Sequence, residues 1–154
     1  MKKIEVIIYK SQYQQDHKRL SLEWLNENNL YEDADGLMLD YPKREVLDKG
    51  GFIYLAKISS QIVGTITLVP SDNNSYEILK FGVSKNHQRL GIGRILLEYC
   101  IDKAKTFNAG KIILETNTKL ESAIRLYTKL GFEEIVLQNT KYEMSDFKME
   151  LLLK

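Results

Sequence analysis

The chain has 154 residues, with 22 lysines and arginines against 21 aspartates and glutamates, which gives a formal net charge of +1. This balance lacks the basic excess of nucleic-acid-binding domains, so we expect no nucleic-acid partner. The length predicts one domain over residues 1–154, because a chain of this size buries about 70% of its unfolded surface without disulfides or metals.

The small number of cysteines and histidines argues against a disulfide-stabilised protein and against a zinc protein. Cys100 is the single cysteine, so no internal disulfide can form, and His17 and His87 are too scattered for a zinc site. We expect no metal. No run approaches the ~18 apolar residues that cross a membrane, so we expect no membrane partner and a cytoplasmic location.

The first third of the chain is predicted to contain a strand and a helix. Alternating apolar residues over 4–9 predict the strand. Ser11 and Gln14 have capping-box spacing, and apolar residues at helical spacing, including Trp24, predict a helix of about four turns after them. No element is predicted for the acidic stretch over residues 31–40.

The middle of the chain is predicted to form a short helix and three strands. Pro42 can open the short helix, and Gly50 with Gly51 would end it. Runs rich in β-branched residues, separated by polar turns, then predict strands at 52–57, 62–69 and 76–83.

The last part alternates helices with strands. Apolar periodicity predicts a helix over residues 92–107 that Gly110 ends, followed by a strand at 111–116. Thr118 and Glu121 have a second capping-box spacing before a helix that reaches residue 130, and Gly131 supplies its left-handed C-terminal residue. Strands at 135–137 and 147–153 complete an α/β or α+β domain whose strand, helix, strand unit implies a parallel pair.

The most informative segment lies between a predicted strand and the long helix: Gln88, Arg89, Leu90, Gly91, Ile92 and Gly93. Two glycines at a helix entrance let the backbone approach a ligand, and the free amides face that ligand with the positive end of the helix dipole. The pattern therefore indicates an anion-binding loop. The third glycine of the dinucleotide fingerprint and the Gly-Lys-Ser/Thr of the P-loop are both absent. A tight turn without a ligand is the alternative.

This loop, preceded by Phe81-Gly82-Val83, resembles the coenzyme A loop of the GNAT superfamily of N-acetyltransferases. Residues 123–132, which include Tyr127 and Gly131, are similar to the superfamily's A-x-x-L-Y-x-x-L-G-F segment. The resemblance is strongest over residues 51–132. It implies a mixed, mostly antiparallel twisted sheet of six or seven strands, open between the fourth and fifth, with helices on both faces.

The resemblance also implies acetyl-CoA as co-substrate. The six loop residues and Arg94 would hold its pyrophosphate through backbone amides. The backbone of Phe81 and Val83 would pair with the pantetheine arm like an added strand, and the first of these amides would polarise the acetyl carbonyl. Gly82 between them invites a β-bulge that opens the strand.

Glu77 is the predicted general base. We expect it on the same strand face as Leu79, Phe81 and Val83, where many GNAT enzymes also carry a glutamate. Because its Cα would lie about 13 Å from that of Phe81, a water relay is expected. A solvated glutamate with no catalytic role is the alternative.

Tyr127 and Asn117 complete the predicted site. The resemblance makes Tyr127 the general acid toward the coenzyme A sulfur, with a buried core tyrosine as the alternative. Many relatives have an asparagine where this chain has Leu120, and Asn117 is expected to supply the missing cofactor contact.

The function implied is acetyl transfer from acetyl-CoA to a primary amine of a small molecule, by direct attack without a covalent enzyme intermediate. Two alternatives stay open: a non-catalytic acyl-CoA-binding or regulatory module, and a protein or peptide N-acetyltransferase. The acidic residues Glu32, Asp33, Asp35 and Asp40 would attract a cationic acceptor, or are only solvated. We expect a monomer or a homodimer.

Overall fold

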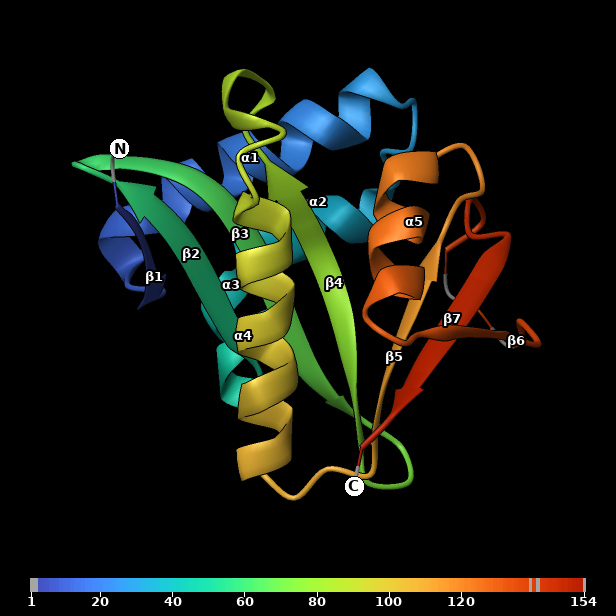
Figure 1. Cartoon of the computed structure of the whole chain (residues 1–154). Coiled ribbons are helices and arrows are strands. Elements are labelled where there is room, and N and C mark those ends of the chain that lie inside the picture. Colours follow the sequence, from blue (N-terminus) through green and yellow to red (C-terminus); the bar gives the residue numbers. More distant parts are fainter. Residues whose placement is uncertain (1–2, 139, 141, 154) are drawn as a thin grey trace.

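The computed structural model describes residues 3–138, 140 and 142–153. In this part of the chain a seven-stranded sheet has the strand order β1-β2-β3-β4-β5-β7-β6 (Figure 1). Its strands are β1 (Ile4–Ile8), β2 (Phe52–Ile58), β3 (Gln61–Ser71), β4 (Ser75–Val83), β5 (Lys111–Thr116), β6 (Glu133–Ile135) and β7 (Phe147–Leu152).

Helices cover both faces of this sheet (Figure 1). On one face lie α1 (Gln14–Glu27), α2 (Asp33–Asp40) and α3 (Pro42–Glu45), and on the other lie α4 (Ile92–Thr106) and α5 (Glu121–Lys129). Short 3-10 turns lie in the connections between helices and strands: η1 (Ser11–Tyr13), η2 (Leu47–Lys49) and η3 (Lys85–His87). The predicted fold class, a mixed and mostly antiparallel sheet with helices on both faces, is confirmed.

The sheet opens between β4 and β5. These strands are parallel and pair only over residues 75–78 and 111–114, whereas every other neighbouring pair is antiparallel. Residues 79–83 of β4 therefore run beyond the pairing with β5 and leave one backbone edge open. The predicted opening between the fourth and fifth strands is confirmed.

A β-bulge lies on β4 just before Gly82. Leu79 pairs with Thr67 and Gly82 pairs with Thr65, so β4 advances three positions while β3 advances two. The extra residue is accommodated by Lys80, whose φ of +49° is left-handed. The sequence predicted the bulge at Gly82, but the left-handed residue of the bulge is Lys80.

This bulge changes which face each β4 side chain occupies, because side chains alternate along a strand. Leu79 packs with the α1–α2 side, in a cluster with Leu20 and Met38. After the bulge Phe81 and Val83 pack instead with the core of the α4 side. The prediction that Glu77 shares a face with Phe81 and Val83 is wrong, although it shares one with Leu79.

Neither predicted capping box forms. Lys10 precedes η1 without a side-chain cap, so Ser11 lies inside that turn. Thr118 donates its amide to Asp146 Oδ1 at 2.8 Å and its hydroxyl to Oδ2 at 3.1 Å. The distant carboxylate thus replaces the local cap, and α5 begins after Leu120.

Other elements also differ from prediction. The acidic stretch forms α2 with Gly36 inside it. Helix α4 ends before Gly110, because Asn108 adopts the left-handed conformation with φ of +59°. Strand β6 begins at Glu133, two residues before the predicted start. Gly131 is left-handed at φ +101°, as predicted, and the Phe132 amide bonds back to the Tyr127 carbonyl at 3.0 Å.

Candidate active site

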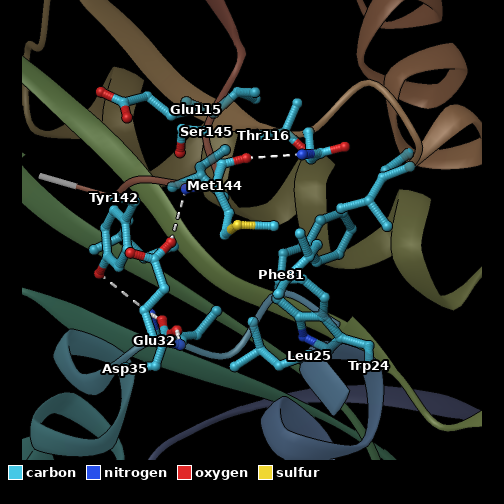
Figure 2. A pocket seen from close by; sticks show the side chains of 18 of the residues that line it. Trp24, Leu25, Glu32, Asp35, Phe81, Glu115, Thr116, Tyr142, Met144 and Ser145 are labelled. Atoms are coloured by element: carbon cyan, nitrogen blue, oxygen red, sulfur yellow. Dashed lines mark hydrogen bonds and ion pairs between the residues drawn. The ribbon is translucent and has the colours of Figure 1, made fainter. Parts of the chain in front are cut away.

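A cavity of about 120 Å³ lies where β4 and β5 separate. Its walls come from both faces of the sheet: Trp24 and Asp35 from one side, Ala123 and Tyr127 from the other. Figure 2 shows Phe81 and Thr116 of the two strands between these walls. The opening therefore connects the two faces, which is the arrangement that two substrates approaching from opposite sides require.

The predicted anion-binding loop leads into α4 at the open edge of β4. Gly91 is the N-terminal cap of α4 with φ of +83°, and Arg89 is left-handed at φ +66°. Gln88, Arg89, Leu90 and Arg94 are exposed, Leu90 to 57%, whereas the Ile92 side chain is buried in the core. The exposed side chains matter little for a ligand that is held by backbone amides. The first amides of a helix have no partner inside it, and here they can bind an anion.

Gly93, the second residue of α4, packs closely over Phe81 and Val83 of β4. A Cβ there would lie 3.4 Å from Phe81 Cζ and 3.7 Å from Val83 Cγ2. The helix backbone thus comes near the part of β4 that pairs with β3 but not with β5.

The amides and carbonyls of β4 alternate in direction, and this alternation decides which of them are available for hydrogen bonds at the open edge. Ser84 donates its amide to the Val63 carbonyl of β3 at 2.8 Å. Because hydrogen-bonding direction alternates along an antiparallel strand, Phe81 and Val83 direct their amides away from β3 toward the opening.

Tyr127 lies at the α5 wall of the cavity. Its side chain is buried, with its ring centroid 6.1 Å from that of Phe81 and 5.8 Å from that of Phe132. Burial raises the pKa of Tyr127 above its usual value. The phenol therefore stays protonated and can donate a hydrogen bond, but it is a weak acid.

A buried ion pair fixes the opposite side. Lys80 Nζ lies 2.6 Å from Asp35 Oδ1, and both side chains are 4% exposed. The other Asp35 oxygen accepts the Glu32 amide at 2.8 Å. Helix α2 is thereby attached to the bulge of β4, and the left-handed backbone of Lys80 is held by a partner 45 positions earlier.

Carboxylates gather around Tyr142 at this end of the cavity. Burial is the main cause that raises the pKa of Tyr142, and the charges of Asp35, Glu77, Glu32 and Glu115 follow in that order. All four carboxylates line the cavity. Lys80 is the lining lysine that faces them, at 3.4 Å from the Tyr142 hydroxyl. This wall is suited to a cation.

The chain between β6 and β7 closes the same wall. The two carboxylate oxygens of Glu32 accept the amides of Glu143 and Met144 at 2.9 and 3.0 Å. Asn117 donates from Nδ2 to the Met144 carbonyl at 2.8 Å and accepts the Lys119 amide on Oδ1 at 3.0 Å. Residues 142–145 are thus tied to both α2 and β5.

The structure brings several predicted residues together and separates others. Glu77, Phe81, Asn117 and Tyr127 all line one cavity, with the loop of residues 88–94 beside it on the α4 side. Glu32 and Asp35 of the acidic stretch line it too, whereas Asp33 and Asp40 do not.

Sequence reasoning missed Trp24, Lys80 and Tyr142 as lining residues. Trp24 had been assigned only to an apolar helix face. Lys80 stands in an otherwise apolar strand sequence, and this was the signal from which a buried acidic partner could have been predicted. Leu120, noted as a departure from relatives, packs with Trp24 against a cluster of leucines and so adds an apolar wall.

The described residues show neither a membrane-spanning helix nor a cluster of metal ligands. No helix in this part of the chain is long and apolar enough to cross a membrane. No group of three or more histidine, cysteine, aspartate or glutamate side chains there has an arrangement that could hold a metal ion. Cys100 lies in the core, as expected, and burial raises the pKa of its thiol.

The open mixed sheet with a glycine-capped helix at its split indicates an acyltransferase fold, and similarity to known proteins supports this class. The model of the acetyltransferase (GNAT) family matches residues 14–132. A solved acetyltransferase of the GNAT family from Staphylococcus aureus Mu50 is 30% identical, with a TM-score of 0.88 over 99% of this chain and 100% of that one. The chain belongs to the GNAT acetyltransferase family.

One further sequence relative and one solved structure of similar fold are informative. The [ribosomal protein bS18]-alanine N-acetyltransferase of Escherichia coli K12 is 30% identical over 49% of this chain and 51% of its own. Spermidine N-acetyltransferase from Vibrio cholerae, solved with CoA and spermine, is 20% identical with a TM-score of 0.72 over 97% of this chain and 95% of that one. The chain spans about half the length of several of the curated relatives that it matches.

Proposed function

We propose that the protein transfers the acetyl group of acetyl-CoA to a primary amine of a small cationic molecule, by direct attack of the amine. The observation that carries this proposal is the cavity at the sheet opening, which has an open backbone edge on one side and four carboxylates on the other. Membership of the GNAT family supports acetyl-CoA as co-substrate.

The co-substrate would lie along the α4 side. Residues 88–94 bind its pyrophosphate through backbone amides, and the amides of Phe81 and Val83 pair with its pantetheine arm. When bound, acetyl-CoA supplies a thioester carbonyl. Asn117 remains a proposed contact to it, made by a side chain that also holds Met144.

The acceptor would enter from the acidic side. An alkylamine is protonated at neutral pH, so Glu32, Asp35, Glu77 and Glu115 attract it, and one proton must leave before attack. Glu77 accepts that proton through a water molecule. The amine nitrogen then bonds to the carbonyl carbon, and the carbonyl oxygen takes up negative charge. When that charge returns to the carbon, the carbon–sulfur bond breaks, and Tyr127 donates a hydrogen bond to the departing thiolate. The extra proton on the nitrogen passes to the thiolate, which gives the amide and the CoA thiol.

The test combines binding with turnover. Calorimetry should detect acetyl-CoA binding, and thiol release should be fastest with alkyl diamines, slower with a monoamine of equal length, and slowest with a peptide that has a free N-terminus. Binding without thiol release for any amine would identify a binding module instead. Peptides that outcompete the diamines would identify a protein or peptide N-acetyltransferase.

Glu77→Gln separates proton removal from other roles of this residue. The loss of kcat/KM should be largest near pH 7 and should shrink toward pH 9.5, because at high pH the amine arrives already neutral. A loss of equal size across this range would mean that Glu77 positions the acceptor and is not the base.

A further inference from the structure

One polar group in the cavity wall lacks a partner. The indole nitrogen Nε1 of Trp24 is buried, and no hydrogen-bond acceptor reaches it among the residues that the structure describes. The hydroxyls of Ser21 and Thr67 share this state, but a hydroxyl rotates and can also accept. An indole N–H only donates, in one fixed direction, and buried tryptophans normally find an acceptor for it.

The fold holds this donor firmly against β4. A Cβ on Gly82 would lie 2.2 Å from Trp24 Cδ1 and 2.6 Å from Nε1, so only glycine lets the indole approach so closely. Behind the ring, Leu25, Leu30 and Leu39 form an apolar cluster that offers no side-chain acceptor. Figure 2 shows Trp24 beside Phe81 and Leu25 in the cavity wall.

Its place along the strand relates the donor to the site. Gly82 stands between Phe81 and Val83, the two residues whose amides face the opening of the sheet. A ligand that pairs with this edge comes next to the indole. The missing acceptor is therefore expected on the ligand and not on the protein.

Resting on the proposed function, we propose that the Trp24 indole N–H is a second hydrogen-bond donor to the acetyl carbonyl oxygen of acetyl-CoA, beside a backbone amide of β4. This oxygen gains negative charge as the carbon–nitrogen bond forms, and loses it when the carbon–sulfur bond breaks. A fixed donor in a water-poor site stabilises that charge without having to reorganise.

The chain contains a single tryptophan, which makes the test specific. Labelling with ¹⁵N-tryptophan gives one indole N–H resonance, to be followed during titration with acetyl-CoA and, separately, with CoA, while calorimetry measures the affinity of each. Because CoA lacks the acetyl oxygen, a marked downfield proton shift with acetyl-CoA and a much smaller one with CoA are expected.

Equal shifts with both ligands, or no shift although acetyl-CoA binds, would overturn the assignment of Trp24. If calorimetry shows no binding of acetyl-CoA, the proposed function itself fails, and this inference fails with it. The two failures are therefore distinguishable.

An isostere gives the second readout. Incorporation of 3-benzothienylalanine in place of tryptophan changes position 24 alone and removes the N–H while keeping the ring shape. We expect kcat to fall by about 10²-fold, the typical effect of one oxyanion donor, with the acetyl-CoA affinity nearly unchanged. An unchanged kcat, where chemistry limits the rate, would overturn the proposal.

Glycine variants check how the donor is held. Gly82→Ala should move the indole resonance even without ligand, because the added Cβ collides with the ring. Gly110→Ala is the matched control, since its Cβ would meet its nearest atom, the Asn74 carbonyl oxygen, at an ordinary 3.6 Å. An unmoved resonance in folded Gly82→Ala would contradict this placement of Trp24.

Discussion

His17 should make the fold less stable in mild acid. It lies in α1, 1% exposed, with Nδ1 at 2.7 Å from Thr65 Oγ1 of β3. Burial first, and the Lys80 charge second, lower the pKa of His17 from 6.5 to about 4. The unfolded chain therefore binds a proton that the folded chain does not. Stability decreases as the pH falls below 6.5, and the loss is complete below about pH 4.

Linkage gives the size of this loss. A difference of one in pKa corresponds to about 1.4 kcal/mol, so the shift of His17 to about 4 is worth about 3 kcal/mol in full. About 2 kcal/mol of it should develop between pH 7 and pH 5, where the folded His17 is still mostly neutral.

Urea unfolding at pH 7 and pH 5 measures this loss. His17→Gln can still hydrogen-bond to Thr65 but does not titrate, and the contributions of all other groups cancel when the two proteins are compared. The wild type should lose about 2 kcal/mol more than the variant between these pH values. His87→Gln, outside the core, should behave like the wild type. Equal losses in wild type and His17→Gln would refute the reasoning.

Three further predictions concern the Lys80–Asp35 pair, the α4 loop and Tyr127. Asp35→Asn keeps an acceptor for the Glu32 amide but removes the carboxylate charge 2.6 Å from the buried Lys80 Nζ, so urea unfolding should show a loss of about 3 kcal/mol or more. Adding Lys80→Met should recover part of it, and a double variant no more stable than the single one would contradict this account. Gly91→Val should raise the Kd of acetyl-CoA about tenfold or more in calorimetry, whereas Gly50→Val, with a similar φ of +85° at another turn, should not. Tyr127→Phe should lower kcat about tenfold with little change in affinity, and a wild-type kcat under rate-limiting chemistry would leave Tyr127 a packing residue.

Local signals in the sequence were sufficient for much of the fold. The apolar periods predicted α4, α5 and the meander from β2 to β4, because each depends on residues a few positions apart. The left-handed Gly131 was predicted correctly because a left-handed residue at the C-terminal end of a helix favours glycine wherever the helix packs. The sheet opening came from the family resemblance and not from periodicity.

Features that depend on distant partners were not predicted. The Thr118 cap is replaced by Asp146, 28 positions away, and the bulge is held by an ion pair between Lys80 and Asp35, 45 positions apart. Backbone preference gives no reason to expect a left-handed lysine in a strand. Because the bulge was not located at Lys80, the period of two was carried through it and assigned Glu77 to the wrong neighbours.

The extra residue of the β4 bulge, Lys80, determines how the proposed acceptor side and the proposed acetyl-CoA side of the site lie relative to each other. Before it, the odd-numbered residues of β4 face α1 and α2, which places Glu77 with the carboxylates of the proposed acceptor side. After it, Phe81 and Val83 face α4, next to Tyr127 and Gly93, and Gly82 turns toward Trp24. A regular strand would direct Phe81 at the indole and Gly82 at α4. The Lys80–Asp35 pair stabilises the bulge. The bulge in turn places the Glu77 side chain, the proposed base, on the α1–α2 face of the sheet, and the Phe81 and Val83 side chains on the α4 face.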